Sequence, residues 1–144
     1  MVQQVASDIQ TTYEELPLFL PVLNGSYLFM ADLTRALKTP HRVEFIKYQS
    51  YAGTASTGKL TAQIGLDRDA IEGESVLIVE DIVDSGRTVA ELRKLLEDMG
   101  ASEVCCVTAF FKPGTHNYGP VPEFIGREIP DDFVVGYGMD YNGW

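Results

Sequence analysis

Basic residues and long apolar runs are scarce in this chain of 144 residues. Its 11 lysines and arginines are outnumbered by 21 acidic residues, and the resulting formal net charge of −10 argues against nonspecific nucleic-acid binding. No apolar run approaches the roughly 20 residues that a membrane-spanning helix needs. The first residues also lack the basic and apolar regions of a secretory signal peptide. The sequence therefore favours a cytoplasmic protein with neither nucleic acid nor membrane as its partner.

Cysteine is also rare, with only Cys105 and Cys106 present. They are adjacent in an apolar segment, Glu103–Phe110, that is typical of a buried strand, so we expect their side chains on opposite faces. A disulfide framework is thereby disfavoured, and reduced core thiols are expected. The length suits one domain with a substantial core.

The stretch Ser75–Met99 is the most informative part of the chain. Its uninterrupted apolar run, residues 76–79, predicts a strand buried on both faces, which Glu80 and Asp81 terminate. Small and turn-forming residues follow at positions 84–88. Helical spacing then relates four apolar residues: Val89, Leu92, Leu96 and Met99. We predict a strand, a tight loop and a helix.

We expect this helix to start with a capping box formed by Thr88 and Glu91, and to end at Gly100. Free amides at its N-terminus favour an anion, most simply a phosphate. The adjacent carboxylates of Glu80 and Asp81 fit a ligand that also carries a diol or a divalent cation, such as a phosphorylated sugar. An ordinary strand–helix turn without a ligand is the alternative.

A second strand–turn–helix pattern precedes it. Leu16–Leu23 is an apolar run, with Pro17 and Pro21 expected at strand boundaries or at an irregular edge. Residues 24–26 form a turn before a helical pattern. Gly25 permits close backbone approach, so this turn is either another anion site or a plain connection.

Two further strands, Val43–Tyr51 and Leu60–Ile64, flank small polar residues at positions 52–58. That hairpin tip is either a disordered loop or a lid that excludes water from a reactive intermediate. The alternation of strands and helices along the chain predicts an α/β protein with a mainly parallel, twisted sheet.

The sequence at positions 76–88, Val-Leu-Ile-Val-Glu-Asp-Ile-Val-Asp-Ser-Gly-Arg-Thr, resembles the diphosphoribosyl-binding signature of type I phosphoribosyltransferases. The variant is most similar to the hypoxanthine (guanine) phosphoribosyltransferases. This resemblance implies a sheet flanked by helices, a flexible hairpin lid and a small, incomplete hood. It also implies a single domain over residues 1–144, shorter at both ends than the family pattern.

The resemblance implies a Mg²⁺-dependent reaction of purine salvage. Ribose 5-phosphate passes from phosphoribosyl diphosphate to N9 of hypoxanthine or guanine, and pyrophosphate leaves. Asp84 is the implied general base near purine N7, although it could also serve as a helix N-cap. Glu80 and Asp81 would engage the ribose diol directly or through the metal. The implied binding residues for the 5-phosphate are Asp84, Ser85, Gly86, Arg87 and Thr88.

Other site residues follow from the same resemblance. The implied pyrophosphate loop comprises Leu23, Asn24 and Gly25, with a cis peptide between the first two and Asn24 where many members carry lysine. The implied mobile lid includes Ser50, Tyr51, Ser56 and Thr57.

The segment Pro130–Tyr141 closely resembles the purine-binding and second-metal segment of the family. There, Phe133 would stack on the base and the Val134 backbone would read its edge, while Asp140 would help hold magnesium. Lys112 would donate to the purine 6-oxo group, although a lysine just beyond a strand commonly only reaches solvent.

His41 and His116 lie among polar residues, and we expect both to be exposed. Two other functions stay open: a phosphoribosyltransferase preferring xanthine or guanine, and a nucleotide-binding regulator without turnover. The resemblance also implies a homodimer or homotetramer.

Overall fold

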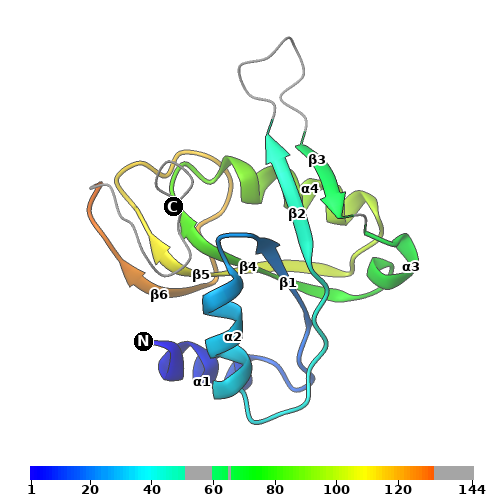
Figure 1. Ribbon diagram of the computed structural model, residues 1–144, viewed down its shortest axis with the longest axis horizontal. Coiled ribbons are helices and arrows are strands. Elements are labelled where there is room, and N and C mark those ends of the chain that lie inside the picture. Colours follow the sequence, from blue (N-terminus) through cyan, green and yellow to red (C-terminus); the bar gives the residue numbers. More distant parts are fainter. Residues whose placement is uncertain (51–59, 65, 132–144) are drawn as a thin grey trace.

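The computed structural model describes residues 1–50, 60–64 and 66–131 (Figure 1). The helices are α1 (Val2–Thr12), α2 (Tyr27–Ala36), α3 (Arg68–Ile71) and α4 (Arg87–Asp98). The strands are β1 (Leu18–Leu23), β2 (Ile46–Ser50), β3 (Leu60–Ile64), β4 (Ser75–Val83), β5 (Glu103–Phe111) and β6 (Phe124–Glu128). Within these ranges no helix is long and apolar enough to cross a membrane.

The strands form one six-stranded sheet in the order β3-β2-β1-β4-β5-β6. Neighbours from β2 to β6 pair in parallel, and β3 alone pairs antiparallel, with β2. The predicted α/β class and mainly parallel sheet are therefore confirmed. In Figure 1, β2 and β3 lie side by side toward the top of the view, with their arrows pointing in opposite directions.

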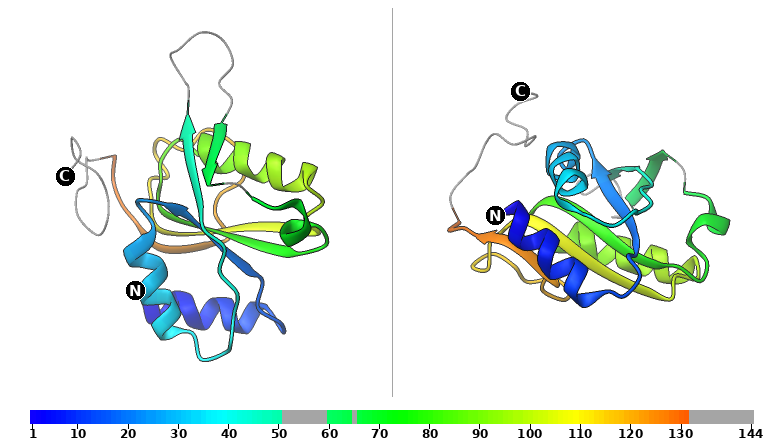
Figure 2. Two further views of the ribbon diagram at one scale, coloured as in Figure 1. Left: turned by 45° about the vertical axis from the view of Figure 1, so that its right-hand side comes forward. Right: turned by 90° about the horizontal axis from the view of Figure 1, so that it is seen from below.

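Helices cover both faces of the sheet, as Figure 2 shows. One core cluster joins the buried residues of α1 and α2 to side chains such as Phe19 and Leu77. The other joins α3 and α4 to alternate strand residues such as Leu20 and Ile78. Cys105 packs in the first cluster and Cys106 in the second, which confirms that they point to opposite faces.

This arrangement puts a topological switch point between the neighbouring strands β1 and β4. The helix that follows β1 packs on one face, whereas the helix that follows β4 packs on the other. The carboxyl ends of two such strands leave a crevice between their loops, and ligands of open α/β sheets bind there. The fold therefore places the two predicted anion-binding turns side by side.

The strand boundary expected for Pro21 is wrong, because this proline lies inside a central strand and is paired with Val79 of β4. The neighbour on its other side is interrupted: β1 meets Val43 in an isolated bridge at Phe19, and regular pairing with β2 begins only at Val22. Backbone groups two residues apart point the same way, so Pro21 directs its missing N–H toward this gap. Pro17, by contrast, precedes the strand, as expected.

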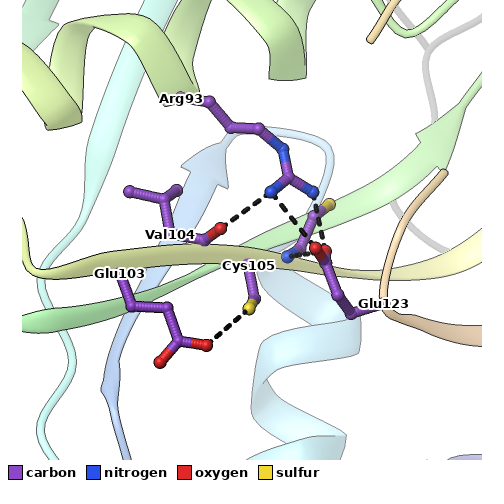
Figure 3. A network of polar contacts seen from close by, with 6 residues as sticks. Arg93, Glu103, Val104, Cys105 and Glu123 are labelled. Atoms are coloured by element: carbon purple, nitrogen blue, oxygen red, sulfur yellow. Dashed lines mark hydrogen bonds and ion pairs between the residues drawn. The ribbon is translucent and has the colours of Figure 1, made fainter. Parts of the chain in front are cut away.

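An ion pair between the buried Arg93 and the exposed Glu123 anchors the segment that joins β5 to β6 (Figure 3). Glu123 lies just before β6, and its Oε1 accepts from Arg93 Nη2 at 2.6 Å and from the Cys106 backbone N–H at 2.8 Å. Arg93 Nη1 also donates to the Val104 carbonyl at 2.7 Å. Pairing of β5 with β6 begins at Val107, one residue after Cys106. The Glu123 carboxylate therefore supplies the hydrogen-bond acceptor that the Cys106 N–H does not find in β6. Neither residue stood out in the sequence.

Candidate active site

Three loops meet at the carboxyl ends of β1, β4 and β5. The β1 loop meets the end of β4, where a Cβ on Gly25 would lie 2.8 Å from Cγ of Asp81. The β4 and β5 loops are joined where the Lys112 backbone N–H donates to the Val83 carbonyl at 3.0 Å. Apart from Ser50, the predicted site residues that the structure describes lie on these loops or in the strand and helix ends that border them.

The β4–α4 loop has a different helix start from the one predicted. Gly86 is the N-cap, with φ of 90°, and Arg87 is the first helical residue. The first backbone bond of the helix runs from Ala90 N–H to the Gly86 carbonyl. Thr88 is therefore inside the first turn, and the predicted capping box with Glu91 does not form. Asp84 is not the N-cap either, so that alternative role is excluded.

Gly100, predicted at the other end of this helix, does follow it directly, with φ of 92°. The left-handed conformation allows Ala101 N–H to bond to the Leu96 carbonyl.

The loop encloses a small polar hollow of about 120 Å³ at the N-terminus of α4. The amide end of a helix of this length favours an anion, and Gly86 leaves the backbone free of a side chain. Ser85 Oγ accepts from Arg87 N–H at 3.3 Å, which fixes its hydroxyl beside the hollow. The hollow is lined by Glu80, Ile82, Val83, Asp84, Ser85, Gly86, Arg87, Thr88 and Val89. The lining includes the five residues at positions 84–88, which are those predicted to bind the 5-phosphate.

The loop after β5 packs against the β4–α4 loop and stabilises it through hydrogen bonds. The backbone N–H groups of Asn117 and Tyr118 both donate to the Ser85 carbonyl, at 3.0 and 2.9 Å. Arg87 Nη2 donates to the Tyr118 hydroxyl at 2.9 Å, and the guanidinium lies 4.9 Å from the centre of the same ring. Sequence reasoning missed this support, because backbone donors from a distant loop leave no residue pattern.

His116 belongs to the same supporting loop, and the prediction that it is exposed is wrong. Its ring meets Phe111 edge-on at 5.2 Å between centres, and a Cβ on Gly86 would lie 2.6 Å from its Nε2. His41 is likewise half-buried, edge-on to Phe19. Both rings serve as packing elements despite their polar neighbours in sequence.

Glu80 and Asp81 place two carboxylates beside the hollow. Burial, reinforced by the charge of Asp81, raises the pKa of Glu80, which is 8% exposed. Asp81 Oδ1 accepts from Ile82 N–H at 2.7 Å. Carboxylate oxygens are ligands that suit Mg²⁺, and this donor set fits the predicted metal. The described ranges hold no group of three or more acidic, histidine or cysteine residues close enough for a metal site by themselves.

The turn after β1 contains the cis peptide bond that the resemblance implied, between Leu23 and Asn24. The buried Ser26 hydroxyl donates to the Val22 carbonyl at 2.7 Å and closes the turn beneath α2. Gly25 lies against the Asp81 carboxylate, where a larger residue would displace it. Binding of an anion by this turn stays a prediction.

Asp84, which lines the hollow, also lies close to Lys112. Lys112 Nζ lies 3.7 Å from Asp84 Oδ2, and the other oxygen, Oδ1, accepts a hydrogen bond from the Thr115 hydroxyl. The lysine side chain is only 9% exposed, whereas that of Asp84 is 56% exposed. The alternative in which Lys112 only reaches solvent is therefore wrong. A carboxylate and a buried ammonium group are available to one ligand here.

The remaining predicted residues are not brought into the site by the described structure. Ser50 is the last residue of β2. The other lid residues and the predicted purine and second-metal residues lie outside the described ranges: Tyr51, Ser56, Thr57, Phe133, Val134 and Asp140.

A family model described as the phosphoribosyl transferase domain matches residues 2–142. The chain belongs to the phosphoribosyl transferase family. A hypoxanthine phosphoribosyltransferase of Salmonella typhimurium is 43% identical over 121 residues, which cover 83% of this chain and 67% of that protein. A hypoxanthine-guanine phosphoribosyltransferase of Mycobacterium bovis is 39% identical over 145 residues, covering 97% and 71%.

Solved structures agree with this assignment. A hypoxanthine-guanine phosphoribosyltransferase from Bacillus anthracis superposes with a TM-score of 0.88 at 35% identity, covering 97% of this chain and 83% of that one. The type I phosphoribosyltransferase fold predicted from positions 76–88 is therefore confirmed.

Proposed function

We propose that this phosphoribosyltransferase makes a purine nucleotide from phosphoribosyl diphosphate and hypoxanthine or guanine, releasing pyrophosphate. One observation carries the proposal: the anion-binding hollow at the start of α4 opens beside the facing side chains of Asp84 and Lys112. A phosphate site next to one acceptor and one donor suits a sugar phosphate joined to a 6-oxopurine. Names of the relatives, which are hypoxanthine or hypoxanthine-guanine phosphoribosyltransferases, support the same reaction.

The loop residues divide the work of binding the sugar phosphate. Backbone N–H groups over positions 84–88 bind the 5-phosphate, aided by the hydroxyls of Ser85 and Thr88. Asp81 and Glu80 accept from the ribose diol, directly or through the metal. The turn of Leu23, Asn24 and Gly25 binds the pyrophosphate through its backbone, since Asn24 carries no charge there. The short distance between Gly25 and Asp81 brings the two halves of the substrate together.

Asp84 is the group that we assign to proton transfer. It accepts or stabilises the proton at purine N7 while N9 becomes the nucleophile. The reacting ribose carbon gains oxocarbenium character as pyrophosphate departs, so the lid residues Ser50, Tyr51, Ser56 and Thr57 serve to exclude water. Magnesium, which Glu80 and Asp81 together with Asp140 would hold, supplies charge neutralisation to the departing pyrophosphate.

Lys112 selects the base. An ammonium group only donates hydrogen bonds, so it suits the 6-oxo group of hypoxanthine, guanine or xanthine and not the 6-amino group of adenine. Phe133 stacks on the ring and the Val134 backbone reads its edge in this proposal. A xanthine-preferring enzyme differs only around the purine 2-position. A regulator without turnover has no need for Asp84 and Lys112 to face each other.

The proposal is tested by incubating the purified protein with Mg²⁺, phosphoribosyl diphosphate and each of four bases, and quantifying the nucleotides formed. We expect turnover with hypoxanthine, guanine or both, and little with adenine. Absence of turnover with all four bases by the folded protein would refute the reaction. Preferential use of adenine would refute the role of Lys112, and preference for xanthine would favour the related enzyme.

Two further statements belong to this proposal. Residues 1–144 form a single domain, and the protein assembles as a homodimer or homotetramer. Sedimentation equilibrium measures the assembly directly, with a mass twice or four times that of one chain as the expected result. A mass equal to one chain across the concentration range would contradict it.

A further inference from the structure

Thr115 touches the proposed acid–base group of the site, although nothing in the sequence singled it out. It lies in the turn that follows β5, three residues after Lys112, and its backbone N–H donates to the Lys112 carbonyl at 3.4 Å. Its hydroxyl donates to Oδ1 of Asp84. Asp84 is thus held on one oxygen by Thr115, while its other oxygen faces the ammonium group of Lys112.

The distance between the charged groups of Asp84 and Lys112 is longer than that of a direct, hydrogen-bonded ion pair. Nζ and Oδ2 are 3.7 Å apart, whereas a direct hydrogen-bonded ion pair of this type is about 2.7–2.9 Å long. The lysine side chain is only 9% exposed, whereas that of Asp84 is 56% exposed and can move toward the ammonium group. The other carboxylate oxygen, Oδ1, is bound by the Thr115 hydroxyl.

We propose that Thr115 is a positioning residue that keeps Asp84 from closing onto Lys112, so that both groups stay available to the purine. The inference rests on the proposed function. O6 and N7 are neighbouring acceptor positions on one edge of a 6-oxopurine. Lys112 must reach the first and Asp84 the second. A direct ion pair between them has to be broken before the base can bind.

The effect of Thr115 is separable from binding of the sugar phosphate. The β4–α4 loop, which is proposed to bind the 5-phosphate, is held by the backbone N–H groups of Asn117 and Tyr118, which donate to the Ser85 carbonyl. Substituting the Thr115 side chain leaves those donors in place. Loss of the hydroxyl should therefore affect the base and not phosphoribosyl diphosphate, whereas a general disruption of the loop would affect both.

Three variants test this inference: Thr115→Val removes the hydroxyl at nearly constant shape, Thr115→Ser retains it, and Thr12→Val is the control. The Thr12 hydroxyl is exposed and bonds only to the Asp8 carbonyl of its own helix, at 2.8 Å. Steady-state kinetics with Mg²⁺ give kcat and both KM values. Thermal denaturation reports on folding. A crystal structure of Thr115→Val gives the distance between residues 84 and 112.

For Thr115→Val we expect kcat/KM for hypoxanthine to fall roughly tenfold or more, because a misplaced reacting group is costly. Its KM for phosphoribosyl diphosphate should stay within about twofold of the native value, and Nζ and the carboxylate should close to about 3 Å. Thr115→Ser should recover most of the loss, and Thr12→Val should behave as the native protein.

Native kinetics in Thr115→Val would overturn the inference while leaving the proposed function intact. So would equal increases in both KM values accompanied by a lower melting temperature, since these mark a structural role. If the native protein itself fails to turn over any base, the proposed function fails, and the role of Thr115 fails with it.

Discussion

Gly25 lies on the loop after β1 and Asp81 lies in β4, yet a Cβ on Gly25 would come within 2.8 Å of Cγ of Asp81. The glycine follows β1 and the aspartate lies near the end of β4, and these strands are neighbours in the sheet. In the proposed site this contact joins the pyrophosphate turn to the carboxylate that engages the ribose diol. The absence of a side chain at position 25 therefore leaves room for the Asp81 carboxylate.

We predict that Gly25→Ala impairs substrate binding more than folding. Gly25 does not have a positive φ, so alanine is conformationally allowed, and the group that must move is the end of a side chain. Displacing Asp81 should raise KM for phosphoribosyl diphosphate about tenfold, which is roughly 1.4 kcal/mol of binding free energy. Steady-state kinetics give KM, and thermal denaturation measures the stability of the fold. A large loss of stability with an unchanged KM would contradict the prediction.

We predict that Gly86→Ala destabilises the fold more than the same change at Gly73. Both glycines have positive φ, 90° and 77°, so alanine costs about 1 kcal/mol at each. At Gly86 the new Cβ would also meet the Tyr118 carbonyl and His116, whereas no described atom lies within 4 Å at Gly73.

Chemical denaturation of the two glycine variants measures this difference. We expect Gly86→Ala to lose at least about 1 kcal/mol more free energy of unfolding than Gly73→Ala. Equal losses of stability would show that the loop after β5 does not restrict the space beside Gly86 in the β4–α4 loop.

We predict that Glu123→Ala costs about 2 kcal/mol of folding free energy. It leaves the guanidinium of Arg93, whose side chain is 10% exposed, without its carboxylate and removes the acceptor of the Cys106 amide. Glu74→Ala is the matched control, because Glu74 also accepts from both Nη atoms of an arginine, Arg42.

The two pairs differ in the exposure of the arginine, whereas Glu123 and Glu74 are similarly exposed, at 36% and 32%. The Arg42 and Glu74 side chains are 61% and 32% exposed, so screening by water limits the cost to about 0.5 kcal/mol. Urea denaturation of both variants gives the two values. Similar costs would mean that burial of the Arg93 pair adds nothing to stability.

The two thiols should resist alkylation in the folded protein up to alkaline pH. Burial raises the pKa of Cys105 and raises that of Cys106 well above its ordinary value. The unfolded chain loses these thiol protons near pH 8.5, whereas the folded chain keeps them, so stability falls as pH rises above that value.

Iodoacetamide labelling at pH 9, followed by mass spectrometry, measures thiol reactivity. We expect modification at both cysteines only after denaturation. Rapid labelling of Cys106 in the folded protein would contradict its burial.

Local sequence patterns predicted the elements whose residues carry their own signal. The apolar run of β4, the turn at Gly25 and the alternation of Cys105 and Cys106 each follow from nearest neighbours in the chain, and the structure bears all three out. Recognition of positions 76–88 then predicted the fold, because that motif is long and specific.

What the sequence could not predict depends on pairing between distant segments. Pro21 is tolerated inside β1 because β2 pairs irregularly beside it, and no local pattern records that gap. The capping box failed because Gly86, in a left-handed conformation, starts the helix before Thr88. Thr115 and Tyr118 reach the site through a turn whose path is set by its contacts with the β4–α4 loop.

The most direct test compares pyrophosphate release by the native protein, Asp84→Asn and the control Asp98→Asn, with Mg²⁺, phosphoribosyl diphosphate and hypoxanthine. Asp98 is exposed at the last position of α4, far along the helix from the hollow. We predict that the native protein and Asp98→Asn release one pyrophosphate for each nucleotide formed. Asp84→Asn should lose about 100-fold or more in kcat while remaining folded. Near-native turnover by Asp84→Asn would contradict the assignment of the acid–base group.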